Sequence, residues 1–78
     1  FEKKEMVVSE KICSLIEDFI DIIGPIGIII SDNYLRKIGY TKGTNMDLKS
    51  YISFVKYLIQ ELPIEKRESF KNKYLNFD

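Results

Sequence analysis

The sequence predicts an all-α fold, a compact four-helix domain built from two helical hairpins with proline corners. Apolar residues recur every three or four positions over long segments, which is the spacing of a buried helical face. Gly24-Pro25 and Leu62-Pro63 interrupt these segments with almost no loop. No second strand is evident to pair with the one β-prone run. We expect residues 1–78 to form a single domain, with helices over about 7–23, 25–38, 47–62 and 63–76.

The first predicted helix, about 7–23, has a single apolar stripe. Charged residues occupy most of its other side, as expected for a helix with one face on a core. Cys13, the only cysteine, lies near the stripe, and we expect it to pack in the core or at its boundary. The stripe consists of Val8, Ile12, Leu15, Ile16, Phe19, Ile20 and Ile23.

The second predicted helix, about 25–38, begins at Pro25, whose fixed φ and missing N–H suit a first turn. The run Ile26–Ile30 has strand propensity, but the residues after it continue at helical spacing. Gly27 and Ser31 share a face and would let another backbone approach closely. We expect Ile26–Ile30 to be buried on most sides and Gly39 to end the helix as its C′ glycine.

The third helix, about 47–62, follows a loop and has the clearest pattern, with Asp47 expected as its N-cap. Its stripe consists of Leu48, Tyr51, Ile52, Val55, Leu58, Ile59 and Leu62. Pro63 ends this helix and opens the fourth, about 63–76, because the residue before a proline avoids the α region. In the fourth helix the residues expected to face inward are Ile64, Arg67, Phe70, Tyr74 and Leu75. The predicted structural corners are Gly24, Pro25, Gly27, Gly39 and Pro63.

The composition predicts a cytoplasmic protein without a membrane span. Twelve basic and twelve acidic residues cancel, so no net field favours nucleic acid, and we do not expect it as a partner. One cysteine cannot form an intrachain disulfide, which fits a reducing compartment. The longest nearly apolar window, 19–30, is shorter than the about twenty residues of a spanning helix. The first residue is not Met, so we expect the chain to be cut from a longer protein.

The residue types predict no enzyme, no metal and no cofactor. Histidine, the commonest general base, is absent, so Cys13 has no imidazole to activate it. Glu17, Asp18 and Asp21 share a helix surface, but no further ligands at metal-binding spacing accompany them. The Gly24–Gly27 corner lacks the Gly-x-x-x-x-Gly-Lys pattern of a phosphate loop.

The two corners carry a family resemblance. Ile23-Gly24-Pro25-Ile26, then a hydrophobic helix ending in Gln60-Glu61-Leu62-Pro63, then Arg67 and Phe70, resembles a small helical domain of uncharacterised role near the C-termini of bacterial signalling proteins, including serine/threonine kinases. Gly27 stands where that family tends to have alanine, and the loop at 39–46 is longer. The resemblance implies an accessory or interaction domain and supplies no active site.

Tyr40, Phe54 and Tyr57 are the candidate interaction surface. Tyrosine offers apolar area with a polar tip and is enriched at interfaces, and Phe54 and Tyr57 fall off the main stripe of the third helix. The alternative is that these residues only cover the rim of the core.

We therefore expect a non-catalytic protein-protein interaction or regulatory module of a bacterial cytoplasmic signalling protein, with a protein partner or a homo-oligomer. Two other functions stay open. One is a DNA-binding regulator, for which Lys66, Arg67, Lys71 and Lys73 form the nearest thing to a basic patch. The other is a small apolar-ligand pocket between the isoleucine-rich helices.

Overall fold

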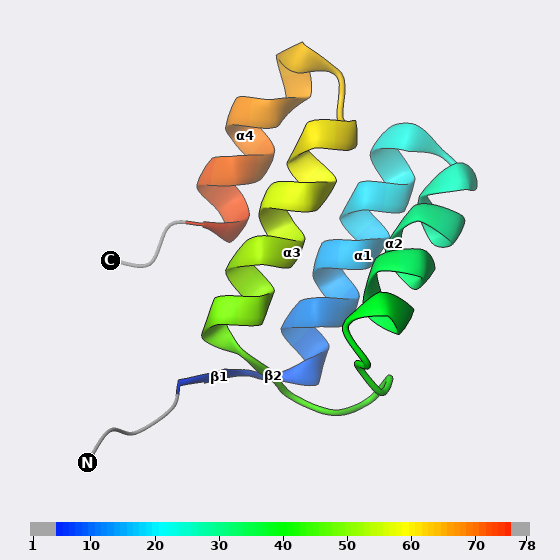
Figure 1. The fold of residues 1–78 in the computed structure, drawn as a ribbon. Helices are drawn as coiled ribbons and strands as arrows, with labels where there is room; N and C mark the ends of the chain where they lie inside the picture. Colours follow the sequence, from blue (N-terminus) through cyan, green and yellow to red (C-terminus); the bar gives the residue numbers. More distant parts are fainter. Residues whose placement is uncertain (1–4, 76–78) are drawn as a thin grey trace.

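The computed structural model describes residues 5–75, and it confirms an all-α fold of four helices (Figure 1). Seven of the eight predicted helix ends lie within two residues of the observed ends, and the eighth, residue 76, lies outside the described residues. The elements are β1 (Met6–Val7), α1 (Ser9–Ile23), α2 (Ile26–Lys37), β2 (Met46–Asp47), α3 (Leu48–Glu61) and α4 (Ile64–Tyr74).

The four helices lie side by side, with α1 and α3 central and α2 and α4 at the two edges (Figure 1). The domain is flat, measuring 41 × 28 × 18 Å. α4 also reaches α1, since the rings of Phe19 and Phe70 meet edge to face at 6.4 Å. The buried hydrophobic cluster takes side chains from every element: Val7, Ile12, Leu15, Phe19, Leu35, Met46, Tyr51, Phe54, Val55, Leu58, Leu62, Phe70 and Tyr74.

The two corners form as short turns. At the first, Gly24 has φ 92°, which favours glycine, and its N–H donates to the Ile20 carbonyl at 2.7 Å. At the second, Leu62 is extended, with ψ 152°, as expected before Pro63. Arg67 does not face the core as expected: it is exposed, and its guanidinium donates to the carbonyls of Leu62 and Gln60 at the end of α3.

The ends of the loop between α2 and α3 follow local sequence rules. Gly39 has φ 76° and its N–H donates to the Arg36 carbonyl, while the Tyr40 N–H donates to that of Leu35. This pair of hydrogen bonds is the Schellman motif, which satisfies carbonyls at the end of α2. The Asp47 side chain accepts the Ser50 N–H at 3.1 Å and so caps α3. Gly39 and Asp47 thus have the predicted roles.

The structure adds a two-strand ladder that the sequence did not predict. β1 and β2 pair antiparallel, with Met6 opposite Asp47 and Val7 opposite Met46. Next to the ladder, the Asn45 Oδ1 accepts the Ser9 N–H at 3.2 Å. The loop before α3 therefore supplies the cap at the start of α1.

Burial predictions are also wrong for Val8, Cys13 and Ile64. Val8, expected on the buried stripe of the first helix, is 52% exposed just before α1 begins. Cys13 is exposed rather than packed in the core or at its boundary. Ile64, expected to face inward, is 77% exposed, because it lies in the first turn of α4 next to the corner, away from the core cluster.

Candidate functional site

α2 packs on α1 through its small residues. Gly27 and Ser31 are buried, and a Cβ added at Gly27 would lie 3.2 Å from the Ile20 Cα. The Ser31 hydroxyl donates to the Gly27 carbonyl at 2.8 Å, so it needs no partner from another helix. Leu35 completes the buried stripe. These residues fix which side of α2 faces the core.

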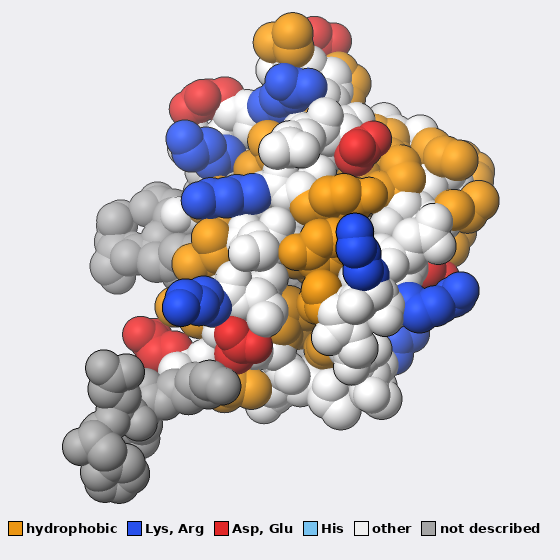
Figure 2. Space-filling model, viewed as in Figure 1, with side chains coloured by type: hydrophobic (Ala, Val, Ile, Leu, Met, Phe, Trp, Pro, Cys, Tyr) orange, Lys and Arg blue, Asp and Glu red, His pale blue; other side chains and the backbone are white. Residues whose placement is uncertain are grey.

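Outside this buried stripe, the first two turns of α2 expose apolar side chains: Ile29 lies opposite the stripe, and Ile26 and Ile28 flank it on either side. Ile26, Ile28 and Ile29 are 53%, 48% and 56% exposed, and we call these three residues the isoleucine face. The prediction that Ile26–Ile30 is buried on most sides is therefore wrong. α2 lies at the edge of the bundle, so only one side of it meets other helices (Figure 1). Orange side chains gather over the first turns of α2, at the upper right of Figure 2.

Charges of opposite sign lie near the two ends of α2. Arg36 and Lys37 are exposed in its last turn, whereas Asp21 is exposed near the corner with α1. Within residues 5–75, none of these three side chains forms an ion pair. The neighbouring Asp32 is paired with Lys42 at 3.5 Å.

The predicted aromatic surface is largely internal. Phe54 is fully buried, and its ring stacks on Tyr34 of α2 at 5.2 Å. Its assignment to a surface is wrong, because α3 contacts α2 as well as α1 and so buries a wider arc than its main stripe. Tyr57 is half-buried against Tyr34, with ring centroids 4.7 Å apart, at the rim of this stack.

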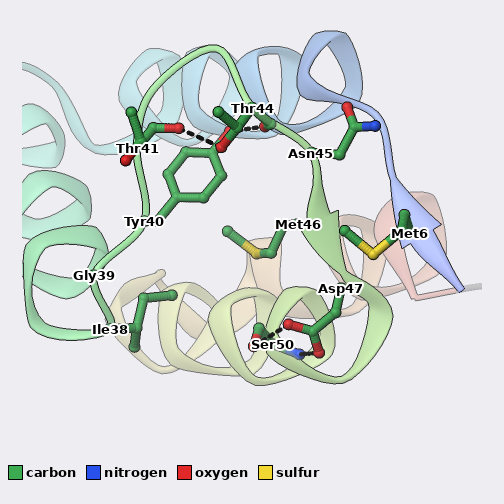
Figure 3. Close-up of a pocket in the computed structure, with 10 residues that line it drawn as sticks. All are labelled: Met6, Ile38, Gly39, Tyr40, Thr41, Thr44, Asn45, Met46, Asp47 and Ser50. Atoms are coloured by element: carbon green, nitrogen blue, oxygen red, sulfur yellow. Dashed lines mark hydrogen bonds between the residues drawn. The ribbon is translucent and has the colours of Figure 1, made fainter. Parts of the chain in front are cut away.

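Tyr40 lies in a shallow hollow of about 330 Å³ beside β2 and the start of α3 (Figure 3). Its hydroxyl donates to the Thr44 carbonyl, and the Thr44 hydroxyl donates to the Thr41 carbonyl at 2.6 Å. Burial raises the pKa of Tyr40. The polar groups of the hollow thus bind one another, which holds the loop in shape.

An apolar hollow of about 210 Å³ separates α1 from the 40–43 loop. It is smaller than the about 300–1,000 Å³ of typical ligand pockets. Its apolar lining comes from Ile12, Cys13, Ile16, Leu35 and Tyr40. It does not involve the isoleucine face.

Asp18 ties α1 to α4. Its carboxylate accepts hydrogen bonds from the Lys73 ammonium at 2.6 Å and from the Tyr74 hydroxyl, and these bonds hold its pKa below the usual value. Burial, together with the hydrogen bond to Asp18, raises the pKa of Tyr74. Asp18 is therefore occupied in packing two helices together.

The comparison of the whole chain with known families identifies one. The profile described as a domain of unknown function, DUF8082, matches residues 10–78, from the first turn of α1 onward. The chain belongs to this family. No curated protein matches the chain, and no solved structure does.

The described part of this DUF8082 domain was searched for a metal site and for a membrane-spanning helix. Among residues 5–75, no three acidic, thiol or imidazole side chains lie together where they could hold a metal ion. In the same range, no helix combines the length and apolarity that crossing a bilayer requires. The isoleucine face accounts for three of the exposed large hydrophobic residues in the described range; the others are Met6, Val8, Ile38 and Ile64.

Proposed function

We propose that this DUF8082 domain is a non-catalytic protein-protein interaction module whose contact surface is the isoleucine face of α2. The half-exposure of Ile26, Ile28 and Ile29 carries the proposal. The three side chains together expose roughly 300 Å² around the first two turns of α2, and exposed apolar surface of this order is often functional. Because Gly27 and Ser31 hold the other side of α2 against α1, the helix cannot turn these isoleucines inward.

The family resemblance at the two proline corners supports a proposal about the kind of protein that carries this domain. We propose that the domain belongs to a bacterial cytoplasmic signalling protein and that it tethers or regulates that protein. The apolar surface supports the same role, since contact with a second protein removes it from water.

Site-specific photocrosslinking in the producing cells tests the proposal. A benzophenone amino acid at Ile29, whose side chain is 56% exposed, should give a protein adduct on irradiation. The matched control places the same amino acid at Ser69, which is exposed on α4. Adducts at Ile29 and not at Ser69 are expected, and the absence of a protein adduct at Ile29 would contradict the proposal.

A further inference from the structure

We infer that α4 is a clasp that detaches from the rest of the domain as a unit, and that the Asp18 carboxylate of α1 is the latch that holds it closed. The inference goes beyond the proposed function and is independent of it, because α4 and α2 lie at opposite edges of the bundle (Figure 1). It follows from the few side chains that α4 buries, from the position of its ties, and from the core that the other elements keep without it.

α4 depends on two buried side chains. Phe70 and Tyr74, four residues apart on one face of the helix, are 3% and 4% exposed, and every other residue of α4 is exposed. A helix of 11 residues is not stable by itself in water. α4 should therefore unfold when these two rings leave the core.

The ties of α4 differ in their reach along the chain. Near the proline corner, the Arg67 guanidinium donates to two carbonyls at the end of α3, at 3.0 and 3.1 Å, and these acceptors lie five and seven positions away. At the far end, the Asp18 carboxylate accepts hydrogen bonds from the Lys73 ammonium, at 2.6 Å, and from the Tyr74 hydroxyl, across 55 and 56 positions. Arg67 thus braces the corner, whereas Asp18 ties the free end of α4 to α1.

The other elements keep a core when α4 leaves. α1 and α2 pack closely at Gly27, and the Phe54 ring of α3 stacks on Tyr34 of α2. The main loss is the cover over Phe19 of α1, which is fully buried and meets the Phe70 ring edge to face at 6.4 Å. Detachment of α4 therefore uncovers an apolar ring that the closed domain hides.

Native-state amide hydrogen exchange of the 78-residue chain tests the inference, because it measures an opening constant for each protected N–H. The N–H groups in the last two turns of α4 should share one opening constant, at least tenfold larger than that of buried residues such as Leu15 in α1 and Val55 in α3. The same constant in all three helices would overturn the inference. So would constants that rise residue by residue towards Tyr74, since they indicate fraying from the chain end.

Asp18→Asn tests the latch. It should raise the opening constant of α4 about fivefold, because a neutral amide holds the Lys73 ammonium less strongly and the site is only partly shielded from solvent. Asp21→Asn, which changes an exposed carboxylate near the end of α1, is the matched control and should leave that constant unchanged. Equal effects of the two substitutions would overturn the assignment of Asp18.

Asp47→Ala separates detachment of α4 from unfolding of the whole domain. It removes the cap of α3, which stays in place when α4 alone is detached. The opening constants of the buried residues in α1 and α3 should rise about fivefold, whereas that of α4 should not change. A rise of the same size in α4 would show that α4 opens only together with the other helices, and would overturn the inference.

Discussion

At the scale of single residues, Gly27 sets the distance between α1 and α2. The space where its Cβ would lie is within 3.2 Å of the Ile20 Cα and of a side-chain carbon of Ile23. Backbone atoms cannot move aside without shifting the helix, so a large side chain here must separate the hairpin. Because Gly27 has no side chain, this side of α2 can pack closely on α1, and Ile26, Ile28 and Ile29 then remain exposed to solvent.

Replacing Gly27 by leucine should lower the free energy of unfolding by about 2–3 kcal/mol, the usual cost of overpacking. Alanine should change it by less than about 1 kcal/mol, because its gain in helix propensity offsets the tight contact. Urea denaturation measures both, with Lys37→Leu at an exposed position of α2 as the control. A Gly27→Leu variant as stable as Lys37→Leu would show that the helices are not closely packed there.

Tyr51 should make the fold sensitive to alkali. Burial raises its pKa to about 12, from about 10 in the unfolded chain. A raised folded pKa means that its contribution is complete below pH 10 and declines as the pH rises towards 12, since only the unfolded state ionises in that window. The loss is on the order of 2 kcal/mol.

Comparison with Tyr51→Phe isolates this contribution. With each protein's stability at pH 8 as its reference, the variant should lose about 2 kcal/mol less than the wild type between pH 10 and 12. Denaturant titrations at a series of pH values measure the difference. Equal losses would mean that Tyr51 ionises as easily in the folded state as in the unfolded one.

At the scale of elements, residues close in sequence cap the helix termini, and Asp47 at the start of α3 is one example. The Asp47 carboxylate accepts both the N–H and the hydroxyl of Ser50, at 3.1 and 2.8 Å. Asp47→Ala should therefore cost about 1 kcal/mol of stability, while Asp47→Ser retains a capping oxygen and should cost less. Thermal unfolding of the two variants measures this, and equal losses would show that the cap contributes nothing.

Signals that depend on neighbours in sequence could be predicted. Asp47 and Gly39 have the predicted roles because a cap or a C′ glycine depends on the residues next to it. The cap from Asn45 to Ser9 could not be predicted in this way, since it joins residues 36 positions apart. The ladder of β1 and β2 is equally hidden, because two-residue strands have no periodicity to detect.

Which side of α2 is exposed could not be predicted either, because it depends on how the helices pack. In α2, apolar residues occur on every side, so periodicity could not tell which side faces the core. Gly27 and Ser31 gave the only signal, and they do face α1. Phe54 was predicted at the surface because its burial depends on the position of α2, whose Tyr34 ring stacks on the Phe54 ring.

At the scale of the whole molecule, a flat row of helices leaves its edge helices half-covered. The exposed residues of α4 are mostly polar, apart from Ile64 in its first turn, and only Phe70 and Tyr74 of its side chains are buried. α2 carries isoleucines instead, at Ile26, Ile28 and Ile29. A small domain buries only a modest share of its surface, so apolar side chains left outside reduce the area that stabilises it. Contact with a partner protein would recover that area.

The most direct measurement is the photocrosslinking experiment with the benzophenone amino acid at Ile29. We predict a protein adduct at Ile29 and none at the Ser69 control. An adduct at neither position, or equal adducts at both, would contradict a protein contact through the isoleucine face.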